Sequence, residues 1–113
     1  MNSKVVNSEI INMEIYIEDS IKHANIPGLT SFRVGITAEN DIRVGLNYDN
    51  HKDGKRIQTQ IKDFFKEVYN IDKVKLERLY NDNAPVMLYD IVFEVPEDKL
   101  NMLYILSKIS KAI

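Results

Sequence analysis

Between residues 32 and 48, apolar and polar side chains alternate along two runs that are separated by a short polar stretch. A period of two is typical of β-strands with one buried and one exposed face. All the apolar members occupy even positions, so a hairpin that keeps them on one face needs an odd number of loop residues. We predict a three-residue loop at 38–40, because Asn40 tolerates the left-handed backbone that such loops need at their last position. The apolar members are Phe32, Val34, Ile36, Ile42, Val44, Leu46 and Tyr48.

The polar face of this predicted hairpin carries two arginines and two glycines. With a three-residue loop, Arg33 lies opposite Gly45, and Gly35 lies opposite Arg43. Glycine weakens a strand and permits close approach of another backbone. Two alternatives follow: each arginine stem lies across the opposite glycine, or a ligand or another chain docks there.

A second hairpin is predicted after residue 73. Its first strand alternates at Val74 and Leu76, and the pattern breaks at Arg78-Leu79, where we expect a bulge. The turn NDNAP precedes the second strand, which is apolar on both faces. A strand of this kind is central in a sheet, or one of its faces meets a partner. The second face of that strand carries Val86, Leu88 and Val92 beside Asp90 and Glu94.

Three segments follow the helical spacing of apolar residues. The segment 8–24 also fits strand alternation, but it is too long for an ordinary strand and is predicted to be a helix. The segment 53–69 has one apolar stripe, and Asn70 suits a left-handed C-terminal cap. The last helix begins near Pro96, with acids early and cations late, as the helix dipole favours. Its predicted inward residues are Leu100, Leu103, Leu106 and Ile109.

These segments predict an α+β fold with the order α-ββ-α-ββ-α. Two β-hairpins form one four-stranded, mainly antiparallel sheet with helices packed on it. We expect a single domain over residues 1–113, with a disordered N-terminal tail at residues 1–7. The second and third helices have the strongest stripes and are expected on one face. The first helix or another chain would then cover the other face.

Composition excludes several classes of protein. The chain has no cysteine, which excludes disulfides, thiolate catalysis and cysteine-ligated zinc. Fifteen Lys and Arg against seventeen Asp and Glu give a net charge of −2, which is unlike a general nucleic-acid binder but permits a local basic patch. The chain lacks a long apolar run or an export signal, so we expect a cytoplasmic protein that does not enter membranes.

The segment YDNHKDGKRIQTQ, residues 48–60, invites comparison with two ligand-binding loops. A calcium loop in this register would have His51 at its third position and Gln60 at its twelfth, where oxygen ligands and a bidentate carboxylate are needed. A phosphate loop fails because the Gly-Lys pair is followed by arginine instead of Ser or Thr. The segment is therefore predicted to be a strand-to-helix turn, with Asp53 or Asn50 capping the helix.

Three cations, Lys52, Lys55 and Arg56, crowd the first turn of this predicted helix. Cations there oppose the helix dipole by about 0.3–1 kcal/mol each. They are either solvated side chains or a small site for an anion or an acidic partner.

No catalytic residue, metal site or cofactor is expected. The serines lack a strained-turn motif such as Gly-x-Ser-x-Gly, and the spacing of the two histidines gives no sign of a metal site. Asp90 and Glu94 share a strand face, where pairing with Arg33 or Arg43 of the neighbouring hairpin explains them better than acid–base catalysis.

The sequence therefore favours a small non-enzymatic protein–protein interaction module, such as a bacterial, plasmid or phage regulator, inhibitor or immunity-type protein. It would bind another protein or itself, as a homodimer, through the second face of the sheet. The alternatives are a nucleic-acid binder with a local basic patch and a small-molecule-sensing domain. The candidate interface residues are Arg33, Gly35, Arg43, Gly45, Val86, Leu88 and Val92; the candidate basic patch is Lys52, Lys55, Arg56, Lys73, Lys75 and Arg78.

Overall fold

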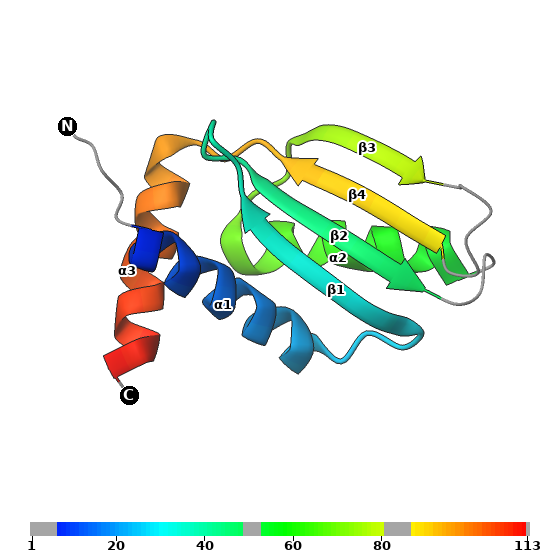
Figure 1. The fold of residues 1–113 in the computed structure, drawn as a ribbon, viewed down its shortest axis with the longest axis horizontal. Helices are drawn as coiled ribbons and strands as arrows, with labels where there is room; N and C mark the ends of the chain where they lie inside the picture. Colours follow the sequence, from blue (N-terminus) through cyan, green and yellow to red (C-terminus); the bar gives the residue numbers. More distant parts are fainter. Residues whose placement is uncertain (1–6, 49–52, 81–86, 113) are drawn as a thin grey trace.

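The computed structural model describes residues 7–48, 53–80 and 87–112, and these residues form three helices and four strands in the predicted order (Figure 1). The predicted tail lies outside the described residues except for its last residue, which begins the first helix. The elements are α1 (Asn7–Ala24), β1 (Leu29–Ile36), β2 (Ile42–Tyr48), α2 (Gly54–Tyr69), β3 (Val74–Tyr80), β4 (Met87–Phe93) and α3 (Glu97–Ala112).

The four strands form one antiparallel sheet in the order β1-β2-β4-β3, which confirms the predicted α+β fold. The first hairpin has the predicted three-residue loop. The backbone N–H of Thr37 donates to the carbonyl of Asp41 at 2.9 Å, and Asn40 adopts φ 65°. Arg33 lies opposite Gly45, and Gly35 lies opposite Arg43, as predicted from the three-residue loop.

The C-terminal end of α2 agrees with the sequence prediction, whereas the N-terminal end does not. Asn70 adopts the left-handed conformation, and its N–H donates to the carbonyl of Lys66, while the buried Ile71 follows as the expected hydrophobic contact. At the other end, Asp53 occupies the capping position without a side-chain hydrogen bond to the helix, so its predicted capping contact is wrong. The alternative cap, Asn50, lies outside the described residues.

The bulge of the second hairpin lies earlier than predicted. It falls at Lys75, where the register with β4 shifts between Val74 and Leu76. The extra residue puts these two apolar side chains on opposite faces of the sheet. Val74 packs against the core, whereas Leu76 lies opposite Val92 on the other face and is 40% exposed.

The core lies on one face of the sheet. α2 covers this face as predicted, but α1 packs on the same side, and α3 packs mainly against α1 (Figure 1). The first helix therefore does not cover the second face of the sheet. The core side chains are Met13, Ile17 and Ile21 of α1, the inward residues of β1, β2 and β4, Ile57, Ile61, Phe65 and Tyr69 of α2, Ile71 after α2, and Leu103 of α3. Ile109, predicted to face inward, is 55% exposed.

α1 also closes one edge of the sheet. Glu14 accepts a hydrogen bond from the backbone N–H of Ile36 at 2.9 Å, and Glu18 accepts one from Val34 at 3.2 Å. Carboxylates four residues apart on a helix match N–H groups two residues apart on a strand, because one helical turn and two strand residues differ in length by only about 1 Å. β1 is thus an edge strand, and two of its outward N–H groups are satisfied by α1.

Candidate functional site

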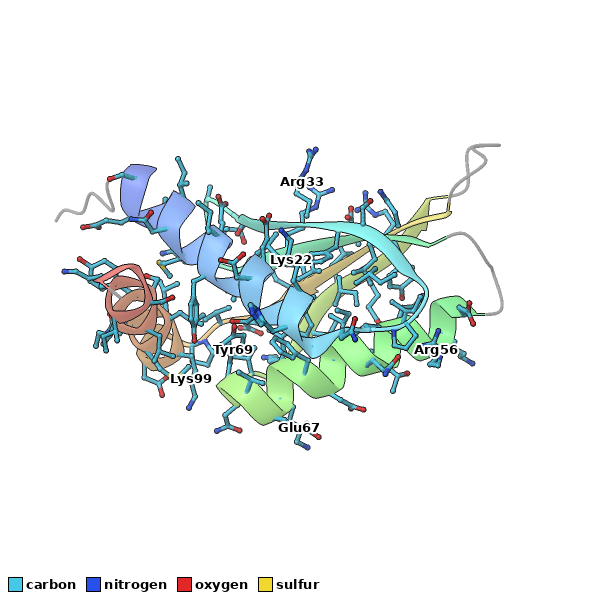
Figure 2. All side chains as sticks on the ribbon, turned by 90° about the horizontal axis from the view of Figure 1, so that it is seen from below. Lys22, Arg33, Arg56, Glu67, Tyr69 and Lys99 are labelled. Atoms are coloured by element: carbon cyan, nitrogen blue, oxygen red, sulfur yellow. The ribbon has the colours of Figure 1, made fainter. Side chains whose placement is uncertain are left out.

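The sheet face opposite the helices, called the open face here, carries no helix in the described part of the chain. Figure 2 shows α2 on one side of the sheet and Arg33 projecting from the other. The open face comprises Ser31, Arg33, Gly35, Thr37, Arg43, Gly45, Asn47, Lys75, Leu76, Arg78, Asp90 and Val92.

A half-open hollow of about 830 Å³ lies on the open face over β1 and β2, and we call it the glycine trough. Gly35 and Gly45 line it without contributing a side chain, and Arg33 and Arg43 line it beside them. Asn47 donates to the hydroxyl of Ser31 at 2.6 Å, and this pair lines the trough as well. The trough therefore offers exposed backbone surrounded by hydrogen-bonding side chains.

The fold itself does not explain glycine at position 35. The backbone of Gly35 and Gly45 is ordinary strand, since Gly28 is the described glycine with positive φ. A Cβ on Gly35 would have one neighbour within 4 Å, the Glu14 carboxylate at 3.9 Å. A Cβ on Gly45 would approach Asp90 at 3.2 Å, which gives that glycine a packing reason. No arginine side chain comes within 4 Å of either position, so the arginine stems do not lie across the glycines.

Of the two cations that line the trough, one has no carboxylate partner among the described residues. Arg43 and the buried Asp90 form an ion pair at 2.5 Å, as the sequence predicted. Glu94 instead pairs with Lys73 at 2.8 Å, so its predicted pairing with an arginine is wrong. The side chain of Arg33 is exposed and forms no hydrogen bond or ion pair with any described residue. The charged side chains lining the trough therefore carry a net positive charge at Arg33.

The apolar part of the open face is smaller than predicted. Val92 is buried without a covering helix, in a hollow that it shares with Leu76, Arg43 and Arg78. Of the other predicted apolar residues, Val86 lies outside the described residues, and Leu88 is placed only by its backbone, opposite Asn47. The described open face is mainly polar, which removes the argument that an apolar surface demands a cover.

The bulge at Lys75 joins distant parts of the open face. Its ammonium group pairs with Glu39 at 2.6 Å and with the buried Asp41 at 2.8 Å, so β3 is tied to the β1–β2 turn across β4. Hydrogen bonds to Asp41 and Glu39 raise the pKa of Lys75. Lys73 and Lys75, from the predicted basic patch, are thus both neutralised by carboxylates.

The predicted anion site at the start of α2 is only partly described, because Lys52 lies outside the described residues. Lys55 is exposed. Arg56 donates to the Pro27 carbonyl at 2.8 Å and to the Gln60 side chain at 2.6 Å, and it lies 3.5 Å from Asp53. Arg56 therefore fastens α2 to the α1–β1 connection. Sequence reasoning missed this role because the partner is a backbone carbonyl far away in the chain.

Outside the trough and the start of α2, the described residues offer little further chemistry. No three His, Cys, Asp or Glu side chains there cluster closely enough to hold a metal ion. None of the described helices is both long and apolar enough to span a membrane. Comparisons with protein-family models, with curated proteins and with solved structures found no match.

Proposed function

We propose that this chain is a small non-enzymatic interaction protein that binds a partner protein in the glycine trough. The observation that carries the proposal is the trough floor, where Gly35 keeps a sheet surface bare without serving the fold. An interaction protein of this size is suited to act as a regulator, an inhibitor or an immunity-type protein.

Glycine at position 35 lowers the stability of β1, so we infer that it serves binding and not the fold. Glycine inside a strand loses more conformational entropy on folding than other residues and adds no side-chain packing. Space for a larger residue is available, since an added Cβ meets only one atom, at ordinary contact distance. A partner segment that binds against the bare backbone explains the glycine, because a side chain at position 35 would occupy the space that the segment needs.

The charges favour a partner that presents a carboxylate. Arg43 and Asp90 neutralise each other, while the Arg33 guanidinium at the side of the trough has no partner among the described residues. Arginine binds carboxylates through two parallel hydrogen bonds, which fixes orientation as well as position. We therefore expect an Asp or Glu of the partner to face Arg33.

The paired state of the other cations makes nucleic acid the weaker alternative. Binding to a phosphate backbone needs several free Lys or Arg side chains in one field. On the open face, Arg43 is paired with Asp90, and Lys75 is paired with Asp41 and Glu39. Steep salt dependence of binding to DNA or RNA would favour that alternative over a protein partner.

The test captures proteins from a host-cell lysate with the tagged chain, identifies them by mass spectrometry and measures the affinity for the purified partner. Gly35→Val fills the trough with a residue that suits a strand, so we expect unchanged or higher stability and at least a tenfold loss of affinity. Arg33→Glu should weaken binding similarly. Lys66→Glu reverses an exposed charge on α2 and serves as the matched control, with affinity unchanged.

Two results would count against the proposal. One is a partner that Gly35→Val and Arg33→Glu still bind with wild-type affinity. The other is a wild-type chain that captures no protein above the level of the Gly35→Val variant. A partner lost with Lys55→Glu but kept by Gly35→Val would instead place the binding site at the start of α2.

A further inference from the structure

The hollow that contains Val92 adjoins the glycine trough on the open face. It has a volume of about 250 Å³, and its two apolar side chains, Val92 and Leu76, lie opposite each other on β4 and β3. Val92 is 8% exposed, whereas Leu76 is 40% exposed. The ion pair of Arg43 and Asp90 lines this hollow as well as the glycine trough, so it stands between the two. We call the hollow around Val92 and Leu76 the leucine hollow.

The cations of the leucine hollow are already engaged within the chain. Arg43 pairs with Asp90, and Lys75 pairs with two carboxylates of the β1–β2 turn. Arg78, which also lines the hollow, is engaged as well. An incoming charged side chain would have to compete with these interactions, whereas an apolar side chain would bury the exposed part of Leu76 without breaking them. The leucine hollow therefore suits an apolar side chain, unlike the trough beside Arg33.

The strand order sets the separation of Arg33 from Leu76. Arg33 lies on β1 and Leu76 on β3, the two outer strands of the sheet (Figure 1). Three strand spacings therefore separate them, which is about 14 Å across the sheet. Gly45 and Asp90 follow Arg33 in the same cross-strand row, and Gly45 adds no side chain to the path. In an extended peptide, residues four apart are about 13 Å apart and point to the same side, so such a peptide can reach both positions.

We propose that the partner binds the open face with an extended segment that crosses the strands and makes two contacts of different chemistry. An Asp or Glu of the segment pairs with Arg33, and a large apolar side chain four residues away, in either direction along the segment, packs against Leu76 in the leucine hollow. The inference rests on the proposed function, because the carboxylate contact belongs to the glycine trough. The apolar contact adds buried surface, while the bidentate arginine contact fixes the orientation of the segment.

The first test selects random peptides of about twelve residues, displayed on phage, for binding to the immobilised full chain. Peptides that also bind the Gly35→Val variant are removed, so the selected ones depend on the glycine trough. We expect the selected peptides to share an acidic residue and a large apolar residue four positions apart. One of them is then synthesised with a fluorescent label, and its affinity for each variant of the chain is measured by anisotropy.

The second test assigns the two contacts with this labelled peptide. Leu76→Asp should lower its affinity at least tenfold, because it puts a charge against the apolar side chain. Leu76→Thr keeps a residue that suits a strand and should lower the affinity severalfold. Arg33→Glu should also lower it at least tenfold, and a peptide with lysine in place of its acidic residue should bind Arg33→Glu again but not Leu76→Asp. Lys66→Glu on α2 is the matched control, with affinity within about twofold of wild type.

Circular dichroism and urea denaturation show that each variant is folded. Selected peptides that lack either shared residue, or that bind both Leu76 variants with wild-type affinity, would overturn the inference and leave the proposed function standing. If every peptide that binds wild type also binds Gly35→Val and Arg33→Glu equally well, the glycine trough is not the binding site, and the proposed function fails with the inference.

Discussion

The hydroxyl of Tyr69 is the described side-chain group that the core leaves without a hydrogen bond. The residue is buried among aromatic rings, with Tyr16 at 6.3 Å and Phe65 at 5.5 Å between ring centroids. The nearby Ser20 hydroxyl donates to the Tyr16 carbonyl at 2.9 Å and closes no hydrogen bond with Tyr69. A buried polar group without a partner lowers stability, because it loses its hydrogen bonds to water.

Replacing this residue by phenylalanine should therefore do no harm. We expect Tyr69→Phe to leave the free energy of unfolding unchanged or to raise it by about 1 kcal/mol, since the ring stays and only the unpaired hydroxyl is removed. Urea denaturation followed by circular dichroism measures the difference. A loss of stability greater than about 1 kcal/mol would show that the hydroxyl has a partner in solution.

The raised pKa of Tyr69 should also make the protein less stable as the pH becomes alkaline. Burial raises the pKa of Tyr69 from 10.0 to about 12, so between these values the folded chain keeps a proton that the unfolded chain releases. Stability is then fully present below pH 10 and falls as the pH rises to 12, by about 2–3 kcal/mol at most. The comparison of wild type with Tyr69→Phe in urea at pH 9, 10, 11 and 12 isolates this residue. Parallel stability curves for the two proteins would contradict the assignment.

At the scale of the elements, α1 acts as a cover for the edge of β1. Glu14 and Glu18 bond two outward N–H groups of the strand, and without them those groups would be free to pair with another chain. We expect the double variant Glu14→Ala, Glu18→Ala to lose about 1 kcal/mol of stability per hydrogen bond and to aggregate faster on mild heating. Urea denaturation and light scattering measure these effects.

A matched control for this edge is Glu67→Ala, which removes an exposed carboxylate on α2. It should change neither stability by more than about 0.5 kcal/mol nor the rate of aggregation. Equal behaviour of the control and the double variant would show that the two carboxylates do not protect the strand edge.

The comparison of elements shows which parts of the fold a sequence pattern can predict. The register of the first hairpin followed from the even positions of its apolar residues and from Asn40, because both are local. The bulge at Lys75 was misplaced, because the alternation of apolar residues continues across it. Its side chain bonds Asp41 and Glu39, which are remote in the sequence.

In the candidate site, too, the local arrangement was predictable and the long-range packing was not. The arrangement of Arg33, Gly35, Arg43 and Gly45 followed from the register of the hairpin. The arginine stems do not cover the glycines, and docking of a ligand or another chain there stays a prediction. The side of the sheet on which α1 packs was not predictable, because β4 is apolar on both faces. For that reason the sequence predicted the polar face of the first hairpin but not that the described helices leave this face uncovered.

For the whole molecule, the glycine trough and α2 lie on opposite faces of the sheet. The trough lies over β1 and β2 on the open face, whereas α2 packs on the core face (Figure 1). Substitutions at separate sites without shared contacts act independently, so the two faces can be tested separately.

We expect partner binding to depend on the open face and not on the exposed side of α2. Arg33→Glu should lower the affinity for the purified partner at least tenfold, while Glu67→Ala on α2 should leave it within about twofold of wild type. Calorimetry with the purified partner measures both affinities, and urea denaturation of each variant shows that it is folded. An equal loss of affinity in the two variants would contradict binding at the glycine trough.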